Sequence, residues 1–211
     1  MNYAQVERSA LCDTFLRVGP IAPTLCEGWM TGDLAAHLVI RDGRPDLAVG
    51  MFVPPLAGRL DRASRAMAMS DWQALVHRIR TGPPLWSPVR IPRVDEFVNT
   101  GEFFVHHEDV LRAQEDWAPR TLDPGEEAAL WGVLARMAGL LLRSAPAGVT
   151  LVAPGYGRKE AKSGTAQGAV VITGAPSELL LFCFGRRGVA EVTFDGPDAA
   201  VEALRGAKLG F

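Results

Sequence analysis

Residues 95–114 read DEFVNTGEFFVHHEDVLRAQ, a stretch with the apolar spacing of a helix. At about 100° per residue, five polar side chains fall on one stripe of this helix. They are Asp95, Asn99, Glu102, His106 and Asp109. Apolar residues border the stripe on both sides, so we expect it to face the interior of a helical bundle. Buried carboxylates and imidazoles need a charged partner or a metal ion, because burying an unpaired charge is costly.

Helical patterns accompany this stretch over the first two thirds of the chain. Further helices are predicted to begin after Tyr3, at the N-cap Thr31, at the capping box Ser70–Gln73 and at the N-cap Asp123. We expect the second of these helices to extend to Val53–Pro55, where the prolines would end it. Short polar or proline-rich connections join the helices, as is typical of a bundle.

The pattern changes near residue 146. Segments rich in β-branched residues predict strands at 149–152, 169–172 and 189–194, with an exposed hairpin at 154–168 and helical stretches at 177–184 and 197–207. The only lysines among the 22 Lys+Arg, Lys159, Lys162 and Lys208, also lie in this part. We therefore predict an α+β fold of two domains, a helical bundle over residues 1–145 and a small α+β module over residues 146–211.

The overall composition predicts an ordinary globular protein. The chain has 211 residues, of which 48% are hydrophobic and 22% charged, and a net charge of -2, so we expect no nucleic-acid partner. No apolar run is long enough to span a membrane, and the N-terminus lacks the apolar core of a signal peptide. The three cysteines show no C-x-x-C spacing, which argues against a disulfide framework and favours a cytoplasmic location.

Glu102 and His106 are the strongest candidates for metal ligands. They are one helical turn apart, so both side chains can reach a single ion. His37 on the second predicted helix is the natural third ligand, and two histidines with one glutamate would leave a position open on Zn²⁺ or a similar ion. The competing interpretation is a weak intrahelical contact, since most Glu-x-x-x-His pairs are solvated neighbours. His107 projects about 100° away from His106 and is expected at the surface.

Other residues near these candidates have more than one interpretation. Asp109 could orient His106, although a plain solvated carboxylate accounts equally well for it. Cys26 is predicted to be a small buried thiol rather than a redox-active one. For Arg41, a salt bridge to Asp42 is favoured over recognition of a substrate carboxylate.

Two motifs carry a family resemblance. Residues 24–38, TLCEGWxxxDLxxHL, resemble the entry to the second helix in the mycothiol-dependent maleylpyruvate isomerase-like proteins of actinobacteria, which belong to the DinB/YfiT-like metal-binding four-helix bundles. Residues 102–110, EFFVHHEDV, resemble the second metal motif of that family, and residues 41–46, RxxRPD, resemble one actinobacterial subgroup. Residues 174–182, GxPxELLLF, are similar to the family's C-terminal module, which has a sterol-carrier-like α/β fold.

The resemblance implies a metal site formed by His37, Glu102 and His106. It implies Zn²⁺, or another divalent ion such as Ni²⁺, together with mycothiol as a thiol cofactor. The implied activity is that of an enzyme that activates a low-molecular-weight thiol or water for transfer or isomerisation. A metal-dependent hydrolase and a non-catalytic metal- or ligand-binding module remain alternatives. No motif assigns catalytic or cofactor-binding residues, the substrate, or the choice between monomer and homodimer.

Overall fold

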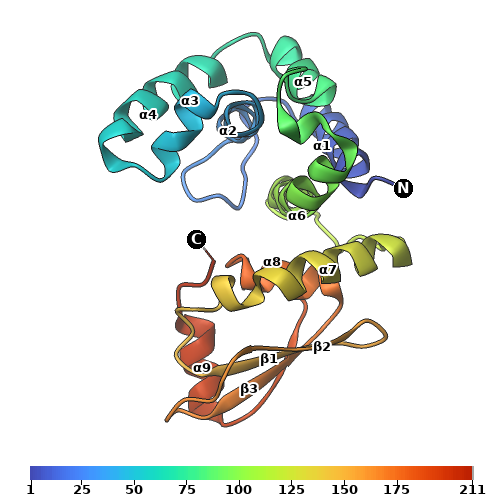
Figure 1. The fold of residues 1–211 in the computed structure, drawn as a ribbon, viewed down its shortest axis with the longest axis vertical. Coiled ribbons are helices and arrows are strands. Elements are labelled where there is room, and N and C mark those ends of the chain that lie inside the picture. The colour runs from blue at the N-terminus through green and yellow to red at the C-terminus, as the bar shows by residue number, and fades with distance from the viewer. Residues whose placement is uncertain (211) are drawn as a thin grey trace. The chain divides into compact units, whose positions relative to one another are not determined.

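The structure, a computed structural model, describes residues 1–210, apart from the side chain of Pro88. The chain forms two compact units, Met1–Pro119 and Arg120–Phe211 (Figure 1). The described part of the first unit consists of helices and their connections, and the second combines helices with a four-stranded sheet. The predicted α+β fold class, with a helical N-terminal part followed by a small sheet module, is confirmed.

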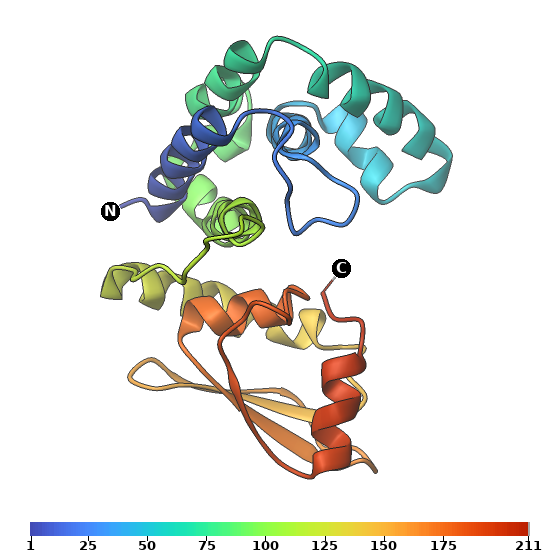
Figure 2. The ribbon, with the colours of Figure 1, turned by 180° about the vertical axis from the view of Figure 1, so that it is seen from behind.

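Four helices build the core of the first unit: α1 (Tyr3–Val18), α2 (Thr31–Gly43), α5 (Trp72–Thr81) and α6 (Pro92–Leu111). α1 packs along α6, and both α1 and α2 pack against α5 (Figure 2). Their apolar faces meet in a buried cluster that includes Leu11, Phe15, Leu34, Val76 and Phe103. Removal of these side chains from water holds the helices together. The same packing fixes the rotation of α2 and α6, which carry the candidate ligands.

The segment between α2 and α5 differs from the prediction of one long second helix. α2 ends at Gly43 and is followed by α3 (Pro45–Ala48), the 3₁₀ helix η1 (Val49–Met51) and α4 (Pro54–Ala68). Pro54, predicted to end a helix, instead occupies the first turn of α4. Proline suits that position because the first turn leaves its N–H groups without helical partners in any case. The prediction of a helix reaching Val53–Pro55 is therefore wrong.

The sheet of the second unit has the strand order β2-β1-β3-β4. Its strands are β1 (Gly148–Ala153), β2 (Gly157–Lys162), β3 (Ala169–Thr173) and β4 (Thr193–Asp195). β1 pairs antiparallel with β2 and parallel with β3, and β4 pairs antiparallel with β3. The predicted exposed hairpin contains β2, which has no fully buried residue. Of the strand predicted at 189–194, only Thr193 and Phe194 enter β4.

Three helices complete the second unit: α7 (Pro124–Leu141), α8 (Pro176–Cys183) and α9 (Asp198–Gly206). α7 begins after the predicted N-cap Asp123, whose side chain accepts the Gly125 N–H at 2.8 Å. It packs on α8 and contacts β2, so it belongs to the unit that starts at Arg120. The sequence analysis places this helix in the bundle domain. Strong apolar character shows that a helix is covered, but it does not show which element covers it.

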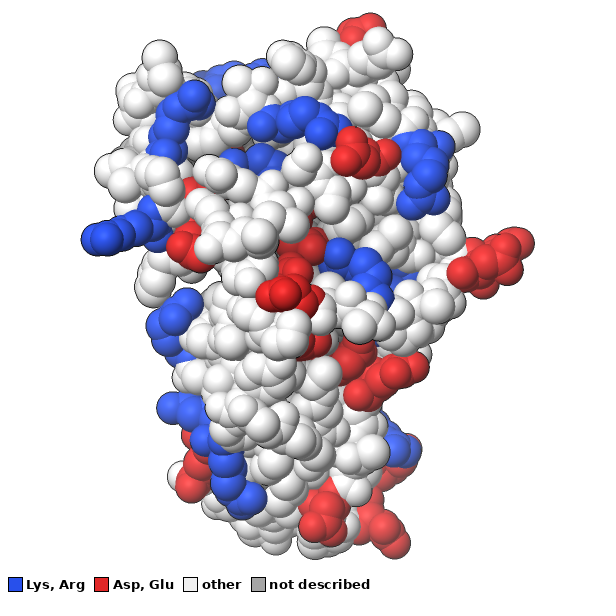
Figure 3. Space-filling model, turned by 90° about the vertical axis from the view of Figure 1, so that its right-hand side faces the viewer, with Lys and Arg blue, Asp and Glu red and all other residues white. Residues whose placement is uncertain are grey.

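Within residues 1–210, no helix has both the length and the hydropathy that a membrane crossing requires. On the face drawn in Figure 3, basic side chains are interspersed with acidic ones. This mixture agrees with the nearly balanced charge of the sequence.

Candidate metal centre

The three candidate ligands from the sequence converge between α2 and α6. The Glu102 Oε1 atom lies 3.5 Å from His37 Nε2 and 3.3 Å from His106 Nε2. All three ligand atoms lie within 4.8 Å of one another. The two imidazole rings meet edge to face, with centroids 5.3 Å apart. His37 therefore joins Glu102 and His106, which lie 65 or more positions later in the chain, in one compact donor set.

Core packing sets the direction of these side chains. Leu34 and Leu38 of α2 are buried in the apolar cluster, which leaves His37 half-buried at the edge of that cluster. On α6, Phe103 is fully buried, and its neighbour Glu102 is half-buried. His106 follows Glu102 by one turn and lies on the same side of α6. The polar stripe predicted on α6 therefore borders the core beside α2.

The carboxylate of Glu102 is kept ionised by His106, His37 and Arg41 together. The Arg41 Nε atom lies 3.0 Å from Glu102 Oε1. Burial favours the neutral carboxyl, but hydrogen bonds from His106 and His37 and the charge of Arg41 outweigh it and hold the pKa of Glu102 well below its ordinary value. The centre therefore contains a negative charge that is available to a cation.

The two histidines differ in their preferred charge. Burial lowers the pKa of His37, so its imidazole is neutral near pH 7, the form that binds metals. Burial opposes the charge of His106 as well, but hydrogen bonds with Asp109, Cys26 and Glu102 raise its pKa well above the ordinary value. A metal ion at His106 Nε2 would therefore displace a proton from that nitrogen.

The donor set has the dimensions of a zinc site. Ligand bonds of about 2.0–2.2 Å place two ligand atoms of a tetrahedral zinc site about 3.4 Å apart. The separations of 3.3 Å and 3.5 Å around Glu102 Oε1 are close to that value. Two imidazoles and one carboxylate also leave a coordination position for a further molecule, as in catalytic zinc sites. The residues present thus fit a divalent ion.

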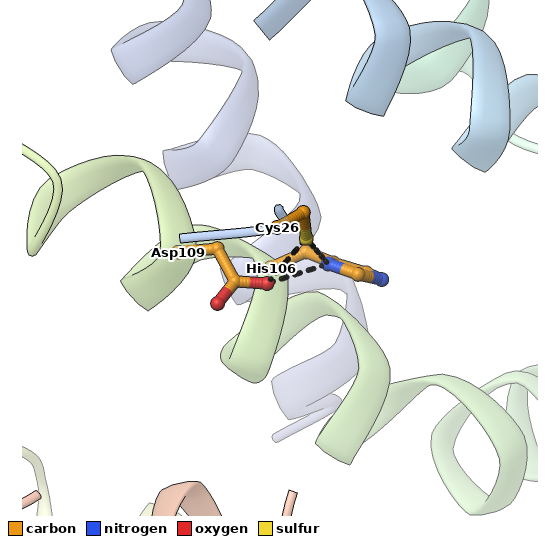
Figure 4. A group of neighbouring side chains, drawn as sticks. All are labelled: Cys26, His106 and Asp109. Atoms are coloured by element: carbon orange, nitrogen blue, oxygen red, sulfur yellow. Dashed lines mark hydrogen bonds and ion pairs between the residues drawn. The ribbon is translucent and has the colours of Figure 1, made fainter. Parts of the chain in front are cut away.

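A second group of donor atoms lies on the Nδ1 side of His106 and is drawn in Figure 4. Asp109 Oδ2 lies 2.9 Å from His106 Nδ1 and accepts a hydrogen bond from Cys26 Sγ at 3.2 Å. Cys26 Sγ and His106 Nδ1 are 4.0 Å apart. Asp109 is fully buried and Cys26 is half-buried. Of the two interpretations of Asp109, contact with the candidate ligand is therefore the one that the structure supports.

His107 is a correction to the sequence analysis. Expected at the surface, it is only 4% exposed. Its Nδ1 atom lies 2.9 Å from Glu7 Oε2, and its Nε2 atom lies 3.0 Å from Thr14 Oγ1. α1 covers this side of α6, so a side chain that projects away from His106 enters the interface between α1 and α6 rather than solvent. Glu7 and Thr14 lie two turns apart on one face of α1. These two polar residues are the feature of the sequence that could have indicated this contact.

Arg41 also behaves as expected. Its Nη1 atom lies 2.9 Å from Asp42 Oδ1, the predicted salt bridge. The contact with Glu102 is an addition that the sequence analysis did not predict, because it depends on the approach of α2 to α6.

Known structures show the same fold. A crystal structure of the mycothiol-dependent maleylpyruvate isomerase aligns with a TM-score of 0.55 and 15% sequence identity, covering 93% of this chain and 92% of that chain. A histidine-to-alanine mutant of that isomerase aligns over the same shares with a TM-score of 0.56 and 16% identity. No protein-family model matches the chain, and no curated protein matches its sequence. The chain is thus similar in fold, over most of its length, to the mycothiol-dependent maleylpyruvate isomerase.

Proposed function

We propose that the protein binds a divalent metal ion through His37, Glu102 and His106, and that it uses this ion to activate a low-molecular-weight thiol or water for transfer or isomerisation. The observation that carries the proposal is the convergence of two imidazole nitrogens and one carboxylate oxygen within 4.8 Å. Nitrogen and oxygen donors in this arrangement favour Zn²⁺, with Ni²⁺ as an alternative.

The residues of the site have separate tasks in this proposal. A bound divalent ion would lower the pKa of a coordinated thiol or water toward neutrality. His37 offers a neutral imidazole nitrogen, and Glu102 offers a carboxylate that its hydrogen bonds and Arg41 keep ionised. Trp29 lies beside His37, with ring centroids 5.2 Å apart, and is 37% exposed. Its indole therefore supplies an apolar wall against which a bound organic molecule could rest.

A small thiol is the favoured partner. The known structures of the same fold are those of a mycothiol-dependent isomerase, which supports mycothiol or a related thiol as the molecule activated here. The motifs at residues 24–38 and 102–110 support membership of the actinobacterial metal-binding family. We also propose a cytoplasmic location, because no disulfide joins any of the three cysteines in residues 1–210, as expected in a reducing compartment.

Metal analysis of protein purified without a histidine tag tests the metal site. We expect stoichiometric zinc or nickel in the wild type and its loss in His37→Ala and His106→Ala. His77→Ala is the matched control, since His77 is an exposed histidine on α5. A metal-free wild type, or equal metal content in His106→Ala and the wild type, would contradict the proposal.

A spectroscopic titration tests the thiol. Cobalt-loaded protein is titrated with mycothiol, and we expect a saturable near-ultraviolet charge-transfer band from thiolate to cobalt that is absent in His37→Ala. Loaded protein that shows no such band would exclude direct thiol activation and leave water activation, as in a hydrolase. A coordination sphere closed by four protein ligands would favour the non-catalytic binding module.

A further inference from the structure

The loop before α2 places a thiol next to His106, on the Nδ1 side of the ring rather than on the Nε2 side that faces the candidate metal centre. Cys26 lies on this loop, and its Sγ atom donates to Asp109 Oδ2 at 3.2 Å (Figure 4). The loop is anchored next to this contact, because the Leu25 N–H donates to the Asp109 carbonyl at 3.0 Å. Within the loop, the Thr24 hydroxyl donates to the Trp29 carbonyl at 2.8 Å. The backbone thus fixes Cys26 against Asp109.

The hydrogen-bond chain determines which nitrogen of His106 carries a proton. An ionised carboxylate can only accept hydrogen bonds, so the 2.9 Å contact between Asp109 Oδ2 and His106 requires a proton on Nδ1. In the neutral ring, Nε2 then carries the lone pair. Nε2 is the nitrogen that lies 3.3 Å from Glu102, on the side of His37. The chain therefore directs the only lone pair of the ring to the candidate centre.

We propose that Asp109 and Cys26 are positioning residues for this centre: Asp109 fixes the tautomer and orientation of His106, and the thiol of Cys26 holds the carboxylate of Asp109 in place. The inference rests on the proposed metal site and adds a role for a loop cysteine that does not touch the ion. Carboxylates that accept from the second nitrogen of a metal-binding histidine strengthen metal binding by about 10–100-fold. We expect Asp109 to have an effect in this range.

A metal ion held directly by Cys26, His106 and Asp109 is the competing arrangement. These three residues offer one ligand atom each within 4.8 Å of one another. The geometry favours the hydrogen-bond chain, because 2.9 Å between Nδ1 and Oδ2 is the length of an N–H···O bond. Two zinc ligands would lie about 3.4 Å apart. Cys26 also lies on the Nδ1 side of the ring, so it cannot bind an ion held by Nε2.

Zinc affinity, measured by competition with a chromophoric chelator, tests the proposal. We expect Asp109→Asn to lose affinity about 10–100-fold. Cys26→Ala should lose less, because Asp109 remains, and Cys26→Ser should bind nearly as well as wild type, because its hydroxyl still donates to Asp109. Glu7→Gln is the matched control: Glu7 pairs with a buried histidine, His107, at the same 2.9 Å, but outside the centre. It should keep wild-type affinity.

Spectra of the loaded wild type test the same proposal without any variant. Nitrogen-15 NMR of the zinc form should show His106 bound through Nε2 with a proton on Nδ1. The cobalt form without added thiol should show no thiolate-to-cobalt charge-transfer band. Binding through Nδ1, or a charge-transfer band that disappears in Cys26→Ser, would overturn the proposal in favour of direct ligation. These spectra decide the question even if Asp109→Asn does not fold.

The outcomes separate this inference from the function on which it rests. Tight zinc binding by the wild type with equal binding by Asp109→Asn would contradict only the positioning role. Wild-type binding as weak as that of His106→Ala would contradict the metal site itself. Equal losses in Cys26→Ser and Cys26→Ala would also overturn the proposed role of the thiol, since the serine retains the hydrogen-bond donor.

Discussion

Arg41 Nε lies 3.0 Å from Oε1 of Glu102, the same oxygen atom that faces His37 Nε2 and His106 Nε2. One carboxylate oxygen is thus shared between a permanent cation and the two candidate imidazole ligands. Arg41 is held in place by Asn99, whose Oδ1 atom accepts from its Nη1 atom at 2.5 Å. The arginine helps to keep Glu102 ionised, but its own positive charge opposes a second cation nearby.

Removal of this charge should strengthen metal binding. In Arg41→Gln we expect zinc affinity to rise about tenfold, which corresponds to about 1.4 kcal/mol. Chelator competition measures the change. Arg44→Gln is the control, because Arg44 pairs with Asp46 at the surface and should leave the affinity unchanged. Weaker zinc binding in Arg41→Gln would show that orientation of Glu102 outweighs the repulsion between cations.

His107 is predicted to stabilise the fold without contributing to the metal site. His107→Ala removes a partner from the buried carboxylate of Glu7, so we expect the free energy of unfolding to fall by about 3 kcal/mol. Urea denaturation measures this loss, and metal analysis of the same variant should still show the wild-type metal content. Loss of metal from folded His107→Ala would refute the division of roles between the two adjacent histidines.

The core between α2 and the other helices should be sensitive to cavities. Leu34 is fully buried in the apolar cluster, and Leu34→Ala should lower the free energy of unfolding by about 2–5 kcal/mol. Leu85→Ala is the control, since Leu85 is 85% exposed. Equal denaturation midpoints for the two variants would contradict the packing described for α2.

Because the thiol of Cys12 is buried, we expect the stability of the protein to depend on pH in the alkaline range. Burial raises its pKa from 9.0 to about 11. Because the folded pKa is raised, the stability from this group is complete below about pH 9 and is lost as the pH rises to about 11, by about 3 kcal/mol at most. Unfolding of the wild type and Cys12→Ser, compared across this range, measures the effect. Parallel stability curves for the two proteins would be inconsistent with a buried neutral thiol.

The fold could be predicted from local patterns wherever those patterns have a single meaning. Glu102 and His106 are correctly placed together because helical geometry fixes their separation. The Pro54–Pro55 pair misleads because prolines are compatible with both the end and the start of a helix. The apolar residues of α7 predict burial, but the choice of α8 as the partner depends on tertiary packing.

The same limit applies to the site. His107 was expected in solvent because one helical wheel does not show that α1 covers the other side of α6. The contact between Cys26 and Asp109 spans 83 positions and depends on the path of a loop, which no periodicity encodes. The convergence of His37 with Glu102 and His106 required a second predicted helix and a family resemblance in addition to spacing.

An anomalous difference map at the zinc absorption edge, from crystals of untagged protein grown with zinc, tests the metal site most directly. The account predicts one peak within bonding distance of His37 Nε2, Glu102 Oε1 and His106 Nε2, with Asp109 still hydrogen-bonded to His106 Nδ1. A peak bonded to Cys26 and Asp109 instead, or no peak near His106, would contradict it.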